Sequence, residues 1–206
     1  GTAGAKITFT SNQPIPAPGD WQYIMFEDES IDYDTLTGQG SQFRNCVVEY
    51  GGGNLTGTDG VITFNSMSIL FDSCSVRNNL GKAIWGNGDI FVFTNSELIG
   101  NQNGIHTGAY FIRFENNLVK ENGLDFVLGS NILFLGGGFS TIKCANNIFC
   151  NNQGHFSIGS YIYSYFKRNI FVNNSTLSGF SGQISFNIGY FNLGYTNNIF
   201  SDNKYL

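Results

Sequence analysis

The densest group of side chains that could bind a metal is an acidic segment near the N-terminus. It contains five carboxylates, Glu27, Asp28, Glu29, Asp32 and Asp34. Calcium is held by several carboxylate and carbonyl oxygens, so this segment is a candidate calcium site. Its spacing differs from the Asp-x-Asp-x-Asp-Gly pattern of an EF-hand loop. A solvated polar loop is therefore the favoured interpretation, with calcium as the alternative.

The two histidines, His106 and His155, are the candidate acid–base residues. Aligning residues 103–106 with residues 122–125 places His106 beside Asp125 on the neighbouring strand. A His–Asp pair of this kind can act as a general base. No Ser or Cys nucleophile stands in a recognisable sequence context, so a surface pair without a catalytic role is the favoured interpretation.

Four aromatic side chains are candidates for contact with a ligand: Phe111, Tyr161, Tyr163 and Tyr165. The three tyrosines alternate, which places them on one face of a β-strand, where exposed rings can stack on sugars. Leu70 and Val92 are expected on the same outward strip. A solvated strip would carry polar residues, so we expect that a loop, a partner or a sugar covers it.

A motif of seven residues recurs along the chain and defines the elements that must position these side chains. Its clearest copy reads Asn-Asn-Ile-Phe-Cys-Asn-Asn at residues 146–152. The seven copies occupy residues 45–51, 73–79, 95–101, 116–122, 146–152, 168–174 and 197–203. They follow one another at intervals of 21 to 30 residues. Such a period is typical of a solenoid.

Strands rather than helices make up each repeat. Apolar residues alternate with a period of two and are mostly β-branched or aromatic, and no segment between copies has a helical period, which argues against a leucine-rich repeat. Asn recurs at matching positions, for example Asn117, Asn147, Asn169 and Asn198. Asn side chains stacked about 4.8 Å apart can donate to one neighbour and accept from the other. The pattern predicts an all-β parallel β-helix of about eight rungs with Asn ladders.

The repeated Asn-Asn-Ile-Phe-x-Asn-Asn rungs resemble the right-handed parallel β-helix repeat of pectate-lyase-like and many secreted bacterial proteins. Residues 1–11, 18–21 and 46–52 resemble an entry module of large secreted or surface β-helix proteins. The resemblance covers nearly the whole chain. It implies a single-stranded right-handed parallel β-helix (a solenoid) and an extracellular or cell-surface location. It does not imply one activity, because a fold of this kind hosts many.

We expect one domain over residues 1–206. Residues 1–42 would form N-terminal rungs with a Pro-rich loop and the acidic loop, and residues 43–206 would hold the seven Asn-ladder repeats. The chain opens in what looks like the middle of a repeat and stops just after one. We therefore expect a segment of a longer chain or a unit that assembles.

Composition argues against several classes of partner and cofactor. The net charge is −5, and no basic patch with interleaved aromatic residues occurs, so nucleic acid is not expected. No run of about 18 apolar residues occurs, so membrane insertion is not expected. The four cysteines lack CxxC spacing, which argues against zinc. Apart from the candidate calcium site we expect no cofactor.

Side chains at equal positions of neighbouring repeats predict specific contacts. Arg44 should pair with Asp72, and Glu49 with Arg77, because opposite charges that face one another across strands attract. Cys46 and Cys74 also share a position. Parallel in-register strands suit a disulfide dihedral badly, so we predict two buried free thiols.

The outward positions of the repeats contain no cluster of three acids. Lyases and hydrolases of the resembled fold would need such a cluster. The leading hypothesis is therefore a non-catalytic extracellular structural or adhesion scaffold that assembles with itself, end to end or laterally. The alternative is a carbohydrate-active enzyme, a polysaccharide lyase or glycoside hydrolase, or a sugar-binding module, with cell-surface polysaccharide as the partner.

Overall fold

The structure is a computed structural model that describes residues 1–27, 29–55, 60–123, 126–128, 141–154, 156–160, 163–176, 184–188 and 191–205. These residues form β-strands, turns and loops, and no helix occurs among them. The described part of the chain therefore also holds no helix that could cross a membrane. The expected all-β class is confirmed.

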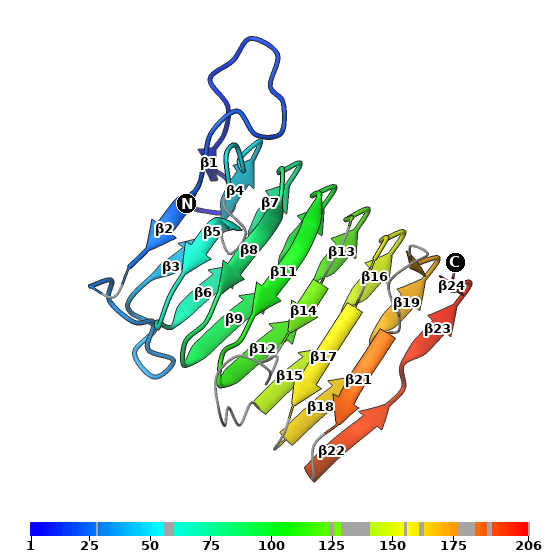
Figure 1. Cartoon of the computed structure of the whole chain (residues 1–206). Helices are drawn as coiled ribbons and strands as arrows, with labels where there is room; N and C mark the ends of the chain where they lie inside the picture. Colours follow the sequence, from blue (N-terminus) through cyan, green and yellow to red (C-terminus); the bar gives the residue numbers. More distant parts are fainter. Residues whose placement is uncertain are drawn as a thin grey trace.

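Three parallel sheets, which we number 1 to 3, contain nearly all the strands (Figure 1). Sheet 1 consists of β1 (Ile7–Phe9), β4 (Cys46–Glu49), β7 (Ser75–Arg77), β10 (Glu97–Ile99), β13 (Leu118–Lys120), β16 (Ile148–Cys150), β19 (Ile170–Val172) and β23 (Ile199–Ser201). Sheet 2 consists of β2 (Ile24–Phe26), β5 (Gly60–Phe64), β8 (Lys82–Gly86), β11 (Asn103–Thr107), β14 (Phe126–Leu128), β17 (Phe156–Ser160) and β21 (Ile184–Ile188).

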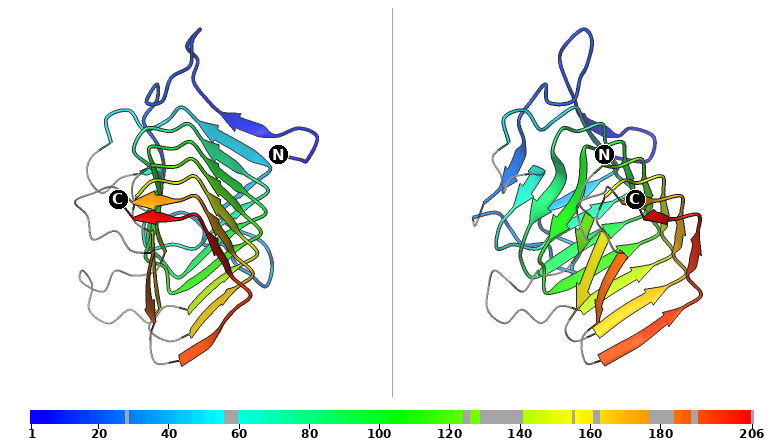
Figure 2. Two further views of the ribbon diagram at one scale, coloured as in Figure 1. Left: turned by 90° about the vertical axis from the view of Figure 1, so that its right-hand side faces the viewer. Right: turned by 45° about the vertical axis from the view of Figure 1, so that its right-hand side comes forward.

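Sheet 3 consists of β3 (Gln42–Arg44), β6 (Ile69–Asp72), β9 (Ile90–Thr94), β12 (Phe111–Glu115), β15 (Thr141–Ala145), β18 (Tyr163–Lys167) and β22 (Phe191–Thr196). A short fourth pair joins β20 (Ser175–Thr176) to β24 (Lys204–Tyr205). Successive strands along the chain belong to the three sheets in turn. Each strand pairs in parallel with its counterpart one repeat later. This arrangement, visible as stacked strands in Figure 2, is compatible with a parallel β-helix.

Columns of aromatic side chains fill the space between the sheets. Phe43 stacks on Phe71 with ring centroids 5.0 Å apart, and Phe149 stacks on Phe171 at 4.4 Å. The buried rings of these columns are Phe43, Phe71, Phe93, Phe114, Phe149, Phe166 and Phe171. Rings stacked in this way add specific attraction to the free energy of burying apolar surface. These apolar side chains form the core.

Two Asn ladders hold the turns on either side of sheet 1. In the first, the Asn147 side chain donates from Nδ2 to Oδ1 of Asn169 at 2.9 Å, and Asn169 donates to Asn198 at 3.1 Å. In the second, Asn79 donates to Asn101 at 2.9 Å and Asn101 to Asn122 at 3.0 Å. Each acceptor oxygen also receives a backbone N–H, as Asn169 Oδ1 does from Asn147. The predicted ladders are confirmed, and they satisfy polar groups that would otherwise be buried without partners.

The left-handed turn residues precede the ladder residues by one position. The column before the first ladder has φ between 50° and 59° and comprises Asn45, Ser73, Asn95, Asn116, Asn146, Arg168 and Asn197. Asn is among the few residues that tolerate this conformation. The left-handed residue turns the chain, and the next side chain then points into the core. The left-handed Asn116 and Asn146 also bond to one another, at 3.2 Å on the exposed side.

Candidate functional site

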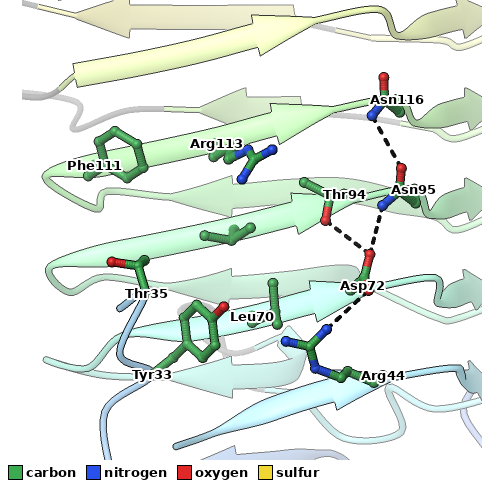
Figure 3. A pocket seen from close by; sticks show the side chains of 11 residues that line it. Tyr33, Thr35, Arg44, Leu70, Asp72, Thr94, Asn95, Phe111, Arg113 and Asn116 are labelled. Carbon is green, nitrogen blue, oxygen red and sulfur yellow. Dashed lines mark hydrogen bonds and ion pairs between the residues drawn. The ribbon is translucent and has the colours of Figure 1, made fainter. Parts of the chain in front are cut away.

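A groove on the outer face of sheet 3 is a candidate binding site in the described part of the chain (Figure 3). Its cavity volume is about 430 Å³. Strands β6, β9 and β12 form its floor, and an N-terminal loop forms one wall. The lining residues are Tyr33, Thr35, Arg44, Leu70, Asp72, Val92, Thr94, Asn95, Phe111, Arg113 and Asn116. Protein sites for small ligands commonly have volumes in this range.

The loop that forms the wall runs from Ile31 to Ser41 and is held by backbone bonds. The Ser41 N–H donates to the Ile31 carbonyl at 2.9 Å, which closes the loop. The Tyr33 N–H donates to the Ser68 carbonyl at 2.9 Å, which fixes the loop beside sheet 3. Gly40 has a φ of 101°, and a Cβ there would lie 2.0 Å from a backbone oxygen of the loop. The sequence therefore sets this wall in one position beside the groove.

Two apolar side chains of the outward strip, Leu70 and Val92, lie at the base of the groove. Leu70 and Val92 point to the outer side of sheet 3, yet each is only 4% exposed. Tyr33 and Thr35 line the same groove as Leu70, and Figure 3 shows Tyr33 beside it. The sequence left open whether a loop, a partner or a sugar covers the strip. At Leu70 the cover is a loop. The strip is open further along, at Phe111, which is half-buried.

Hydrogen bonds and an ion pair fix the polar wall of the groove. Arg44 Nη1 lies 3.2 Å from Asp72 Oδ2, as predicted from the repeats. Asp72 Oδ1 accepts a hydrogen bond from Thr94 at 3.2 Å and from Asn95 at 2.8 Å. The second predicted pair, Arg77 with Glu49, also forms, at 2.7 Å on sheet 1. These contacts occupy the carboxylates with structural partners.

A second charged cluster continues the groove toward the C-terminal half of sheet 3. Glu115 Oε1 lies 2.8 Å from Lys143 Nζ, and Oε2 accepts a hydrogen bond from Arg113 Nε at 2.5 Å. Burial raises the pKa of the Glu115 carboxyl, but Lys143 and Arg113 outweigh it and hold the pKa below its ordinary value. Glu115 therefore stays ionised and holds both cations in place.

Tyr165 lies next to this cluster and carries two ammonium groups near its ring. Lys167 Nζ is 4.4 Å from the ring centroid and Lys143 Nζ is 5.8 Å from it, which are distances of cation–π contacts. Phe111 and Tyr165 thus both lie on the outer face of sheet 3, as expected. Tyr163 belongs to β18 and pairs with Thr141. Tyr161 lies outside the described residues.

Two carboxylates of the acidic segment, Asp32 and Asp34, are engaged in loop structure. Asp32 Oδ1 accepts the Ser68 N–H, and Asp34 accepts the Leu36 N–H at 2.8 Å and the Thr37 hydroxyl at 2.9 Å. These bonds hold the pKa of Asp34 below its ordinary value. Glu27 and Glu29 are described, whereas Asp28 lies outside the described residues. No group of three metal-ligating side chains occurs in the described part of the chain.

The prediction that His106 lies beside Asp125 on the neighbouring strand is wrong. His106 pairs with Val127 on β14, two residues beyond Asp125. The ladder explains the error, because Asn101 and not Asn103 is the partner of Asn122. Our alignment paired the wrong Asn and so shifted the register by two residues. Asp125 and His155 lie outside the described residues.

Sequence reasoning missed Arg113, Glu115 and Lys143 as members of one site. The signal was present, since Arg113 and Glu115 flank the buried Phe114 and so point to the same face of one strand. Lys143 occupies the position of Arg113 one repeat later. Tyr33 and Thr35 had no such signal, because their position depends on how a loop folds back.

We compared the chain with known protein families, curated proteins and solved structures. The chain matches no protein-family model, no curated protein and no solved structure.

Proposed function

We propose that the protein is a non-catalytic extracellular scaffold, a single-stranded right-handed parallel β-helix of about eight rungs of the pectate-lyase-like type. One observation carries the proposal. The outward carboxylates Glu49, Asp72 and Glu115 are each bound to a basic side chain. Each therefore supports the stack of strands.

The partners of these carboxylates, rather than their spacing, differ from what hydrolysis of a glycosidic bond requires. Glycoside hydrolases place two carboxyl groups on either side of the bond, about 5 to 10 Å apart, one of them able to donate a proton. Glu115 has a lowered pKa and two cationic partners, which suits it poorly as a proton donor. A cell-surface location and association with further copies or with polysaccharide belong to the same proposal, supported by the repeat resemblance.

The test is a search for turnover. The purified chain is incubated with a panel of neutral and acidic polysaccharides, with and without calcium, and both reducing ends and unsaturated products are measured. A scaffold gives none above the background of heat-denatured protein. Product release that Glu115→Gln abolishes would overturn the proposal.

A sugar-binding module is the second candidate, and the groove favours it. Phe111 offers an apolar ring beside Arg113, and the Arg44–Asp72 pair faces the same space. Sugars are bound by such a combination, because their C–H faces pack on rings while fixed donors and acceptors bind their hydroxyl groups.

Titration with neutral and acidic oligosaccharides, followed by calorimetry, tests this candidate. Phe111→Ala should weaken binding by about tenfold or more, which corresponds to the loss of one stacking contact. The matched control is Tyr110→Ala, because Tyr110 is 56% exposed and does not line the groove. Equal loss in both variants would count against the groove.

A further inference from the structure

The outer side of sheet 1 carries a continuous aliphatic surface over its C-terminal half. We call it the aliphatic face; it consists of Ile99, Leu118, Ile148, Cys150, Ile170, Val172 and Ile199. These residues alternate with Leu98, Val119, Phe149 and Phe171, which point into the core and are at most 2% exposed. Ile148 is 42% exposed and Ile199 is 56% exposed. The face is therefore apolar and accessible.

The residues of the face belong to two straight rows of outward side chains, which run across five neighbouring strands. Glu97, Leu118, Ile148, Ile170 and Ile199 pair in register along one row. Ile99, Lys120, Cys150, Val172 and Ser201 pair along the other. Neighbours in a row are about 4.8 Å apart, as in any parallel sheet. The surface is thus regular, with one side chain per row on every strand.

The outward positions elsewhere on sheets 1 and 3 include charged side chains. On the N-terminal half of sheet 1 the row that contains Ile99 continues with Arg77 and Glu49, which form an ion pair. On sheet 3 the outward positions mix an aromatic ring, Phe111, with the charged side chains of Arg113, Glu115 and Lys143. Single exposed apolar residues are ordinary, whereas a contiguous apolar patch marks a contact surface. The aliphatic face is therefore a candidate contact surface.

We propose that the aliphatic face docks onto the same face of a second copy of this chain. The inference rests on the proposed scaffold function and names the surface through which copies associate laterally. An identical face has the same spacing between side chains, so the rows of two copies can interdigitate along their whole length. A closed two-fold pair of this kind uses one patch twice.

Charge complementarity favours this partner. Glu97 and Lys120 lie on neighbouring strands and in different rows. A two-fold axis along the stack places the row of Glu97 in one copy over the row of Lys120 in the other. Each Lys120 then lies next to Glu97 of the second copy, twice per pair. Lys120 already lies 3.0 Å from Glu121, so the contact adds to an existing cluster at the rim.

The size of the face sets the expected strength. Five strands span about 20 Å and three residues about 10 Å, a footprint well below the ~800 Å² per partner of stable complexes. The pair should therefore be weak, with a dissociation constant of roughly 100 μM. Such contacts become effective when many copies are held close together, as on a surface.

Sedimentation velocity of the full chain from about 10 μM to about 1 mM tests the proposal. The wild-type chain should shift from monomer to dimer across this range. Ile148→Lys places a charge at the centre of the face and should leave a monomer throughout. The control is Ile15→Lys, at a residue 86% exposed in the N-terminal loop, which should dimerise as the wild type does. Thermal melts check that each variant is folded.

Charge reversal tests the predicted contact between copies. Lys120→Glu and Glu97→Lys should each weaken the dimer about fivefold or more, and the double variant should recover most of the loss. The thiol of Cys150 gives a second readout, because docking should slow its reaction with a maleimide as the protein concentration rises.

Two results would overturn the proposal. A wild-type chain that is monomeric at about 1 mM excludes the second copy as the partner, and binding of that monomer to neutral lipid vesicles through Ile148 would assign the face to lipid. A dimer that Ile148→Lys leaves intact would assign dimerisation to another surface. Turnover of a polysaccharide would refute the scaffold function without affecting these results, and a monomer without turnover would refute only the docking face.

Discussion

Asn146 and Asn147 are adjacent in the chain, yet one lies at the surface of a turn and the other in the core. Asn146 is exposed, has a φ of 57° and turns the chain at the corner between sheets 3 and 1. Asn147 is fully buried and links three neighbouring repeats, accepting from Asn117 and donating to Asn169 and to the Phe114 carbonyl. The Asn146 amide donates to Asn116 Oδ1 at 3.2 Å on the exposed side of the turn, whereas the Asn147 amide makes its hydrogen bonds in the core.

The first prediction compares these two residues. Asn147→Ala should lower the free energy of unfolding by about 2 to 4 kcal/mol, because the Asn117 N–H and the Phe114 carbonyl lose their buried partners. Asn146→Gly should change it by less than about 1 kcal/mol, since Gly readily adopts positive φ. Urea unfolding followed by circular dichroism measures both. Equal effects would mean that the ladder adds nothing beyond the turn.

The second prediction concerns a buried hydroxyl without a partner. Thr107 is fully buried in β11, and its Oγ1 has no hydrogen-bond partner. Thr107→Val keeps the shape and removes the orphan group, so it should raise the free energy of unfolding by about 1 kcal/mol. The control is Thr63→Val on the same sheet, because the Thr63 hydroxyl donates to the Gly60 carbonyl at 2.9 Å. That variant should lose stability, and a loss in both would show that Thr107 has a partner.

The third prediction uses pH. The pKa of Glu115 in the folded chain is below its ordinary value of about 4.3, so the folded state favours the ionised form. Its contribution to stability is complete above the ordinary pKa and is lost as pH falls through the lowered pKa. Glu115→Gln should therefore melt lower than the wild type at pH 6, and the difference should shrink below about pH 4. Thermal melts from pH 7 to pH 2 measure it.

A matched variant controls for the other carboxylates. Glu121 also pairs with a lysine, but its side chain is 52% exposed. Exposed pairs contribute little, so Glu121→Gln should follow the wild-type curve at every pH. A constant difference between Glu115→Gln and the wild type down to pH 2 would show that the cluster does not depend on ionisation of Glu115.

The repeats predict the parts of the fold that local pattern decides. Spacing of the copies gives the register of Arg44 with Asp72 and of Cys46 with Cys74, because in-register parallel strands align equal positions. The groove is different. Its wall depends on how residues 31–41 fold back on sheet 3, and repeats carry no information on such a loop. The misplaced neighbour of His106 has a related cause, since two Asn residues compete for one ladder position.

The last prediction concerns the thiols, all four of which are free, as predicted for Cys46 and Cys74. Burial raises the pKa of the Cys74 thiol to about 11, and burial also raises that of Cys144. The thiolate is the reactive form, so at pH 8 the buried thiols should not react in the folded chain. Cys150 is only partly buried and should react alone, at protein concentrations below those at which copies associate. A thiol assay should therefore count one group in buffer and four in guanidinium chloride, and Cys150→Ser should count none in buffer. Rapid reaction of Cys46, Cys74 or Cys144 would show that the stack of strands opens in solution.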